Sequence, residues 1–283
     1  MSQQQSDTLQ KYTFDVQGHR GARGLAPENS LPAFKKALSL GVNTLELDVV
    51  ISKDQEVVVS HEPWMNHQIC LTPEGGSISS ENQKKLNMYE MDYQQIKKYD
   101  CGSKVYSDYP DQVNQTTYKP KLSEVIKLVQ SYNQQQNKAV HLNIEIKSMP
   151  EGDHIYHPPP KKFVDLVVNV LDKYQVQKKD YNLQSFDFRI LKEIHQGYPV
   201  IRIAALVYQS DMETSLHKLG FKPDIHSPYY PLVNRELIEN AHQKNIKVIP
   251  WTVNSKKDML NLLKLGVDGI ITDYPDKAMK IKK

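Results

Sequence analysis

The sequence predicts an α/β fold, a TIM-type (β/α)8 barrel that forms a single domain. Apolar, β-branched segments alternate with helical patterns along nearly the whole chain, an order that is typical of βαβ units and a parallel sheet. The length of 283 residues also suits one barrel, because such barrels commonly have about 250 residues. We expect the domain to cover residues 12–283 and residues 1–11 to form a disordered N-terminal tail.

Nine segments are expected to be extended, one more than the eight strands of a barrel. They are 12–18, 44–50, 56–61, 139–147, 180–184, 200–206, 223–227, 246–253 and 268–272. Helical patterns lie between most of them, at about 30–40, 122–135, 161–174, 187–196, 211–219, 234–243 and 256–265. Either Asn29 or Ser30 is expected to cap the first helix, since both side chains are favoured N-caps.

The surplus segment is 56–61. It follows 44–50 after only a few residues, a connection too short for a parallel crossover but suited to a β-hairpin. We therefore expect 56–61 to run antiparallel to 44–50, outside the eight barrel strands. If 44–50 projects beyond the carboxyl-terminal rim of the barrel, the returning arm brings His61 back to that rim.

Residues 62–118 interrupt the alternation, being polar and rich in Asn, Gln, Tyr, Ser, Asp and Gly. A structureless loop of this length is uncommon inside a compact domain, so we expect an insertion with a short helix near 92–99. Loops at the carboxyl-terminal face of such barrels form the substrate site, and the insertion is expected to cover it. Cys70 and Cys101 lie within it; they are either two free thiols or, in an oxidising compartment, a disulfide.

Composition excludes several classes of partner. Apolar residues make up 39% of the chain, charged residues make up 24%, and the net charge is +3, so nothing indicates nucleic acid or an acidic membrane surface. No transmembrane segment is predicted. The N-terminus lacks the apolar core of a secretory signal, so the chain is expected to be cytoplasmic as it stands, or periplasmic or secreted if a leader was removed. Nothing indicates an oligomeric state.

Acidic residues occur inside an apolar strand. In TLELDVV, Glu46 and Asp48 lie on one face, about 7 Å apart along the strand. Inward-facing acids are costly unless a cation or hydrogen bonds satisfy them. The alternative is that they face solvent while Leu45, Leu47 and Val49 face the core. In a barrel whose outer surface is covered by helices, the opposite arrangement is expected.

The same pattern recurs in HLNIEIK, residues 141–147. Its aliphatic residues are expected to face the helices, which turns Glu145 and Lys147 inward together with His141 and Asn143. Glu145 comes late in its strand, so three carboxylates meet at one rim. Oxygen ligands of this kind favour a Mg²⁺ or Ca²⁺ ion over zinc. A salt bridge between Glu145 and Lys147 is the structural alternative.

Two histidines are expected at the same rim. His19 ends the first strand in QGHRGARG, where glycines let the backbone approach a ligand, and His61 ends the hairpin arm. A single histidine at a strand end is more often structural, but two beside three carboxylates favour a pair that transfers protons near neutral pH. Arg20 and Lys147 add positive charge that suits a phosphate group.

These motifs carry a family resemblance. HRGARGLAPENSLPAF, followed by GVNTLELDVVISKDQEVVVSHEP, resembles the signature of the glycerophosphodiester phosphodiesterase family. The segments NIEIK, QSF, WTVN and DGIITDYP follow in the family's order, so the resemblance covers nearly the whole chain. It implies a barrel that hydrolyses small glycerophosphodiesters to glycerol 3-phosphate and an alcohol, with one divalent cation, Mg²⁺ or Ca²⁺.

The resemblance also implies a role for each matching residue. The acid–base pair would be His19 and His61. The metal ligands would be Glu46, Asp48 and Glu145. The phosphate contacts would be Arg20 and Lys147, with Trp251 as an apolar wall for the glycerol or the leaving group and Glu28 as a supporting polar residue. Gln184 and Phe186 are either rim residues or ordinary packing, and Asp273 is expected to cap or brace the last turn.

The chain departs from the family pattern just after His61. The acid there is usually Asp and is Glu62 here, and the Arg-Thr-Thr run often found just beyond it is replaced by MNHQICLTP. The metal site does not depend on these residues, whereas specificity for the alcohol does. His154 and His157, in a proline-rich loop, are expected in a surface turn. Two alternatives are a related barrel phosphodiesterase that acts on lipid substrates and an inert ligand-binding barrel.

Overall fold

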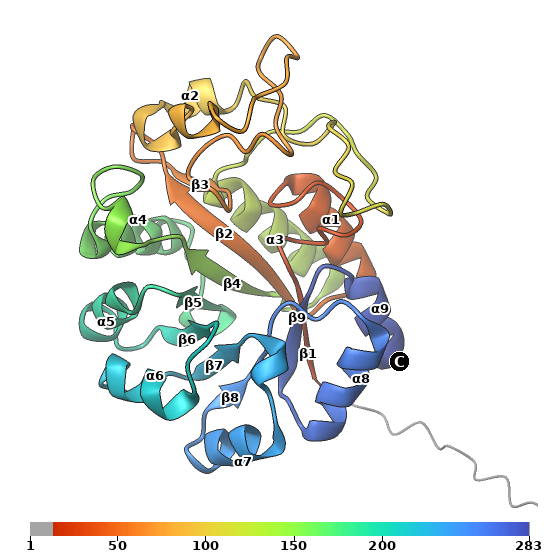
Figure 1. The fold of residues 1–283 in the computed structure, drawn as a ribbon, viewed down its shortest axis with the longest axis vertical. Coiled ribbons are helices and arrows are strands. Elements are labelled where there is room, and N and C mark those ends of the chain that lie inside the picture. Colours follow the sequence, from red (N-terminus) through yellow and green to blue (C-terminus); the bar gives the residue numbers. More distant parts are fainter. Residues whose placement is uncertain (1–13, 283) are drawn as a thin grey trace, which may run out of the picture.

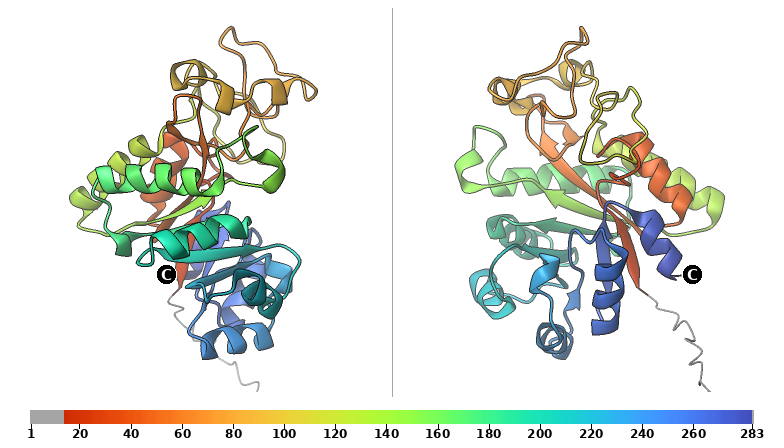
Figure 2. Two further views of the ribbon diagram at one scale, coloured as in Figure 1. Left: turned by 90° about the vertical axis from the view of Figure 1, so that its left-hand side faces the viewer. Right: turned by 45° about the vertical axis from the view of Figure 1, so that its right-hand side comes forward.

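The structure, a computed structural model, describes residues 14–282 and forms a nearly closed (β/α)8 barrel (Figures 1 and 2). The expected tail at 1–11 lies outside the described residues. The parallel strands are β1 (Asp15–Gly18), β2 (Thr44–Ile51), β4 (His141–Ile146), β5 (Tyr181–Ser185), β6 (Arg202–Val207), β7 (Ile225–Pro228), β8 (Lys247–Val248) and β9 (Gly269–Thr272). Within that range they follow the order β8-β7-β6-β5-β4-β2-β1-β9, and every neighbouring pair is parallel.

The barrel closes between β8 and β9 through irregular backbone. The segment expected to be extended over 246–253 is a regular strand only at Lys247–Val248, because Pro250 has no N–H to donate to a neighbouring strand. Three backbone hydrogen bonds join this segment to β9 and the residue before it, from Asp268 to Val248 (3.0 Å), from Ile271 to Pro250 (2.9 Å) and from Val253 to Ile271 (2.9 Å). The eight-strand prediction is therefore confirmed.

Helices cover the outside of the barrel (Figure 1). They are α1 (Leu31–Leu40), α3 (Leu122–Gln136), α4 (Pro160–Lys173), α5 (Phe188–Gly197), α6 (Met212–Leu219), α7 (Arg235–Gln243), α8 (Lys256–Leu265) and α9 (Pro275–Lys282). Ser30 caps α1 by accepting a hydrogen bond from the Ala33 N–H. Helix α9 is absent from the sequence-based prediction. Among residues 14–282, none of the helices is long and apolar enough to span a membrane.

The hairpin forms as predicted. Strand β3 (Val57–Val59) runs antiparallel to β2, with Val49 opposite Val59 and Ile51 opposite Val57. Strand β2 extends two residues past Val49, which is the last position paired with β4. The side chains of Leu45, Leu47 and Val49 are buried in the core between barrel and helices, so the alternating residues of β2 face the interior.

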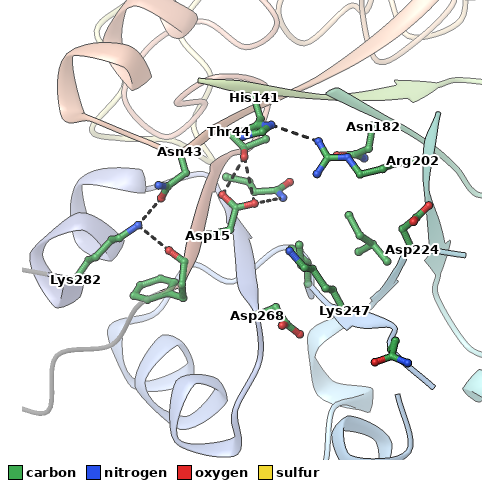
Figure 3. Close-up of a pocket in the computed structure, with 15 residues that line it drawn as sticks. Asp15, Asn43, Thr44, His141, Asn182, Arg202, Asp224, Lys247, Asp268 and Lys282 are labelled. Carbon is green, nitrogen blue, oxygen red and sulfur yellow. Dashed lines mark hydrogen bonds between the residues drawn. The ribbon is translucent and has the colours of Figure 1, made fainter. Parts of the chain in front are cut away.

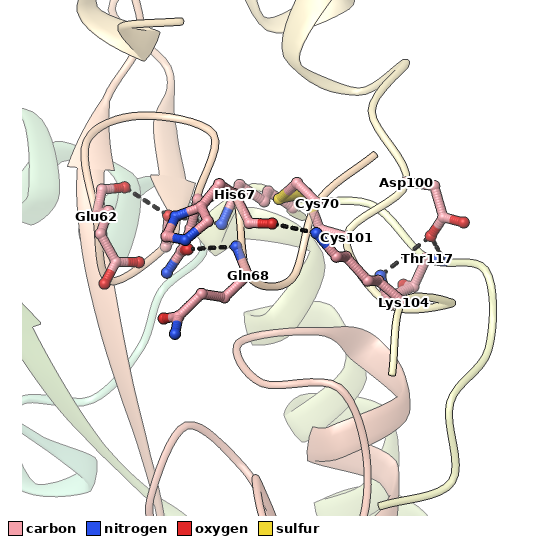
Figure 4. The surroundings of a disulfide bond; sticks show 12 residues. Glu62, His67, Gln68, Cys70, Asp100, Cys101, Lys104 and Thr117 are labelled. Atoms are coloured by element: carbon pink, nitrogen blue, oxygen red, sulfur yellow. Dashed lines mark hydrogen bonds between the residues drawn. A yellow bond between two sulfur atoms is a disulfide. The ribbon is translucent and has the colours of Figure 1, made fainter. Parts of the chain in front are cut away.

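The insertion at 62–118 has a small core of its own. It contains the 3₁₀ turns η1 (Gln83–Lys85) and η2 (Met88–Glu90) and the helix α2 (Tyr93–Ile96), which is shorter than the helix expected at 92–99. Cys70 and Cys101 form a disulfide within this core (Figure 4). Of the two alternatives for the cysteines, the structure therefore has the disulfide.

Figures 1 and 2 show the insertion at one end of the molecule, beyond the tip of the β2–β3 hairpin. It reaches the barrel rim through Tyr109, whose ring lies 4.6 Å from the Arg23 guanidinium carbon. This contact places the insertion beside Arg23 at the edge of the predicted site.

Candidate active site

Three carboxylates meet at the carboxyl-terminal rim of the barrel. Strand β2 provides Glu46 and Asp48 and strand β4 provides Glu145, which lies opposite Asp48 in the register of the two strands. All three side chains are buried, and one oxygen from each lies within 4.8 Å of the others. The predicted convergence of these carboxylates is therefore present in the structure.

Neighbouring groups hold Glu46 at both of its carboxylate oxygens and Glu145 at one. Glu46 Oε2 accepts a hydrogen bond from the Arg20 backbone N–H (2.8 Å), and its Oε1 accepts one from Gln184 Nε2 (2.9 Å). Glu145 Oε1 accepts a hydrogen bond from Lys147 Nζ at 2.7 Å. Both the salt bridge considered from the sequence and the carboxylate cluster therefore exist together.

Asp48 provides the test of whether a cation fits. Its Oδ2 accepts a hydrogen bond from Asn29 Nδ2 (2.8 Å), but its buried Oδ1 lacks a hydrogen-bond partner within residues 14–282. A buried carboxylate oxygen without a donor is costly. A hard divalent cation, which prefers oxygen ligands, would satisfy it together with Glu46 and Glu145. The residues therefore fit a Mg²⁺ or Ca²⁺ ion.

The electrostatics of the cluster agree with that fit. Burial, together with the charges of Asp48 and Glu145, raises the pKa of Glu46 well above its usual range. Burial alone would also raise the pKa of Asp48, but Arg20 holds it well below the usual value for an aspartate. Negative charge is thus concentrated in a buried position, where a cation is most favourable.

His19 is oriented by a carboxylate. Its Nδ1 lies 2.6 Å from Asp273 Oδ1, and because a carboxylate only accepts hydrogen bonds, Nδ1 carries the proton. The other ring nitrogen, Nε2, faces the pocket, 4.0 Å from Glu46 Oε2. Burial lowers the pKa of His19, which favours the neutral ring at neutral pH. Asp273 is itself held by Asn254 Nδ2 at 2.7 Å.

His61 is oriented in the same way. The hairpin brings it to the pocket as predicted, and its Nδ1 lies 2.7 Å from Glu62 Oε1. Burial would raise the pKa of Glu62, but the hydrogen bond with His61 and the nearby charges of His61, Arg20 and Lys119 hold it well below its usual range. Glu62, which departs from the family pattern, therefore still serves as the carboxylate partner of this histidine.

The pocket between the histidines has a volume of about 230 Å³. Its lining combines positive charge with an apolar wall: Arg20, Arg23, Lys147, Phe186, Leu206, Trp251 and Ile271. The rings of Phe186 and Trp251 meet edge to face, with centroids 5.2 Å apart. Glu28 stands behind the lining and holds Arg20 through a 2.8 Å contact with Nη1. Arg20, Lys147, Trp251 and Glu28 therefore lie where the sequence predicted them.

Sequence reasoning missed or misread several site residues. Asn29 was a candidate helix cap, but its side chain binds Asp48. Asp273 was expected to brace the last turn, although it holds His19. Gln184, left open as a rim residue or ordinary packing, lines the pocket as a buried side chain and bonds to Glu46. His157, expected in a surface turn, is instead buried, and its Nε2 bonds to the backbone of Met149.

Known proteins resemble this chain in both sequence and fold. The glycerophosphoryl diester phosphodiesterase family matches residues 19–277. A glycerophosphodiester phosphodiesterase from Bacillus altitudinis is 31% identical over 94% of this chain and 96% of its own length. A second, from Caldanaerobacter subterraneus, is 30% identical over 94% of this chain and 96% of its own length.

Solved structures agree with these matches. A protein from Silicibacter pomeroyi described as a glycerophosphoryl diester phosphodiesterase superposes with a TM-score of 0.85 at 30% identity, covering 96% of this chain and 94% of that one. A phosphodiesterase from Oleispira antarctica, solved in complex with the product sn-glycerol-3-phosphate, shares the fold with a TM-score of 0.74 at 22% identity, covering 94% of this chain and 96% of that one. The chain therefore belongs to the glycerophosphoryl diester phosphodiesterase family.

Proposed function

We propose that this protein hydrolyses glycerophosphodiesters to glycerol 3-phosphate and an alcohol, using one divalent cation and the acid–base pair His19 and His61. One observation carries the proposal. Three buried carboxylates and two histidines, each anchored by a carboxylate, lie around one pocket that also contains three cationic side chains. Membership of the family supports the reaction class.

The cation would be held by Glu46, Asp48 and Glu145. When bound, a Mg²⁺ or Ca²⁺ ion neutralises phosphate charge and polarises the hydroxyl that attacks phosphorus. Its charge would offset the burial and the mutual repulsion that together raise the pKa of Glu46. These three residues are therefore the proposed metal ligands.

Arg20 and Lys147 are the proposed phosphate contacts. Both side chains line the pocket. Each forms an ion pair with a carboxylate, Arg20 with Glu28 and Lys147 with Glu145. An arginine can bind two phosphate oxygens at once, and a lysine adds a compact charge. Phe186 and Trp251 face them and form an apolar wall suited to the carbon atoms of the glycerol or of the alcohol.

The two histidines would move the protons. Each has its Nδ1 bound to a carboxylate, so Nε2 is the nitrogen left for the substrate. One histidine accepts the proton of the attacking hydroxyl, which is either water or the 2-hydroxyl of the glycerol, the latter giving a cyclic phosphate first. The other donates a proton to the oxygen of the leaving alcohol. The carboxylate partners stabilise the imidazolium that forms.

Replacing either histidine tests the proposal. His19→Ala and His61→Ala should each lower kcat for glycerophosphocholine by about 10² to 10⁴, the usual contribution of a general acid or base. His217→Ala, which removes an exposed histidine from α6, should leave kcat unchanged. Thermal unfolding should show that all three variants are folded. Near-wild-type turnover in His19→Ala or His61→Ala would overturn the assignment.

We also propose an oxidising compartment, the periplasm or the outside of the cell. The disulfide between Cys70 and Cys101 supports this proposal, because disulfides rarely persist in a reducing cytosol. Alkylation of free thiols in intact cells of the source organism, followed by mass spectrometry, tests it. Unmodified, paired cysteines are expected; alkylation of both would place the protein in a reducing compartment.

A further inference from the structure

A continuous chain of buried side-chain hydrogen bonds crosses the interior of the barrel. At its centre, Asn143 Nδ2 donates to Gln17 Oε1 (2.7 Å) and to Gln184 Oε1 (3.0 Å). Gln184 Nε2 then donates to Glu46 Oε1 at 2.9 Å. On the other side, Gln17 Nε2 donates to Asp15 Oδ2 at 2.7 Å. Gln17, Asn143, Gln184 and Glu46 are each at most 2% exposed.

The far end of the chain lies at the amino-terminal mouth of the barrel. Asp15 and Thr44 line a cavity of about 550 Å³ there, and the Thr44 hydroxyl donates to Asp15 Oδ1 at 2.9 Å (Figure 3). Asn182, which lines the same cavity, donates to Asn143 Oδ1 at 2.6 Å. The chain therefore connects that mouth with the proposed metal site at the opposite end of the strands.

The chemistry of the two ends fixes the direction of every amide in the chain. In their ionised form, which a bound cation favours for Glu46, the carboxylates of Asp15 and Glu46 accept hydrogen bonds and do not donate them. Each glutamine must therefore turn its NH₂ group toward a carboxylate and its carbonyl toward Asn143. Asn143 has to supply both hydrogens of its own NH₂ group, one to each glutamine, while its carbonyl accepts from Asn182.

The surroundings offer the amides few other partners. The opposite half of the barrel interior is apolar, with Ala204, Ile225, Ile249 and Ile271 packed together. A Gln184 side chain that lost its bond to Asn143 would be free to rotate or to present its carbonyl to Glu46, which would repel the carboxylate. The orientation of Gln184, and through it that of Glu46, therefore depends on Asn143.

We infer that Asn143 and Gln184 are positioning residues, which hold Glu46 in the orientation that binds the divalent cation. The inference rests on the proposed metal-dependent function. With Gln184 at Oε1 and the Arg20 backbone N–H at Oε2, both oxygens of Glu46 are held while each keeps a lone pair for an ion. Groups that orient metal ligands in this way commonly change metal affinity 10- to 100-fold when they are removed.

The test is an isothermal titration calorimetry experiment, in which Mn²⁺ is titrated into the metal-free, full-length protein. Asn143→Leu and Gln184→Met keep side-chain size but remove the donors, and each should weaken Mn²⁺ binding about tenfold or more. The double variant should bind about as weakly as the weaker single variant, because both changes release the same carboxylate.

Gln17→Met is the matched control. It removes an amide from the same buried chain, on the side of Asn143 that leads to Asp15, and leaves the bonds from Asn143 to Gln184 and from Gln184 to Glu46 in place. We expect Gln17→Met and Asn143→Leu both to lower Tm, but only Gln17→Met to bind Mn²⁺ within about threefold of the wild type.

Three results would overturn the inference alone: unchanged Mn²⁺ affinity in Asn143→Leu, an equal loss of affinity in Gln17→Met, or fully additive losses in the double variant. The equal loss would mean that a loosened barrel is the cause. A wild-type protein that binds no divalent cation would instead overturn the proposed metal-dependent function, and this inference with it.

Discussion

At the scale of single residues, the two histidines of the pocket share one design. In each, Nδ1 donates to a carboxylate, Asp273 for His19 and Glu62 for His61, which leaves Nε2 for the proposed proton transfer. The partner fixes the tautomer and stabilises the protonated ring. Asp273 and Glu62 would therefore affect the rate of proton transfer through the histidines that they orient.

This leads to a prediction for Asp273→Asn. An asparagine can present either its carbonyl or its NH₂ group to His19 Nδ1, so the productive tautomer is no longer enforced, and kcat/KM should fall by about 10² to 10⁴. Calorimetric titration should show an unchanged affinity for Mn²⁺, because Asp273 is not a proposed ligand. Glu145→Gln is the contrasting variant and should lose the cation. An Asp273→Asn enzyme with wild-type kcat/KM would contradict the proposed role of Asp273.

The sequence predicted those site residues whose signal is local. The alternating acids of TLELDVV indicated that Glu46 and Asp48 face inward, and the short connection to 56–61 predicted where His61 would lie. It did not predict partners that are distant in the chain, since Asp273 meets His19 across 254 residues. Asn29 had a local explanation as a helix cap, and that explanation was wrong because its side chain binds Asp48 instead.

At the scale of elements, the insertion is the part of the molecule that depends most on a covalent bond. Its core is small, and the disulfide joins two of its buried residues, Cys70 and Cys101, over a separation of 31 residues. The sequence left the pairing open because spacing alone does not place two thiols together. The barrel has a separate and much larger core, so the two parts need not have the same stability.

Removing the disulfide should therefore destabilise the insertion and spare the barrel. By the chain-entropy relation, a loop of this length contributes about 3 to 4 kcal/mol. In Cys70→Ser/Cys101→Ser, amide hydrogens of residues 62–118 should exchange at least about tenfold faster, whereas those of β4 and α4 should exchange as in the wild type. If amide hydrogens of the insertion exchange at the same rate in the variant and in the wild type, packing and hydrogen bonds stabilise the insertion without help from the disulfide.

Element boundaries show where sequence patterns stop being informative. Seven of the eight barrel strands were predicted close to their observed positions. The remaining one, β8, is a regular strand for two residues only, because Pro250 interrupts the pattern of donors. Helix α9 was missed, since its packing against α1, α8 and β1 is a tertiary contact that leaves no strong local pattern in PDKAMKIK.

At the scale of the whole molecule, buried polar side chains of the barrel cluster in hydrogen-bonded networks, and the layer between the barrel and its helices is apolar. His226 is an exception, because it is buried on β7 and its Nε2 lacks a partner within the described residues. Burial lowers the pKa of His226 to about 4. In the unfolded chain its pKa would be about 6.5, so the unfolded chain binds more protons than the folded one at acidic pH.

Stability should consequently fall as the pH drops from about 6.5 toward 4. For His226 alone, the free energy of unfolding should decrease by about 2 kcal/mol between pH 7 and pH 5. Urea unfolding of the wild type and of His226→Leu measures this difference, and contributions of other groups cancel in the comparison. Between pH 7 and pH 5, the free energy of unfolding should fall by about 2 kcal/mol more in the wild type than in His226→Leu. Equal decreases in the two proteins would mean that His226 does not titrate in this way.

Cleavage of a glycerophosphodiester is proposed to need a divalent cation held by Glu46, Asp48 and Glu145. The most direct measurement is the release of sn-glycerol-3-phosphate from glycerophosphocholine by chelator-treated protein, before and after Mg²⁺ or Ca²⁺ is added. We predict turnover only after the cation is restored, and none that can be restored in Glu46→Gln. Turnover by the chelator-treated protein at the rate of the untreated one would contradict the account.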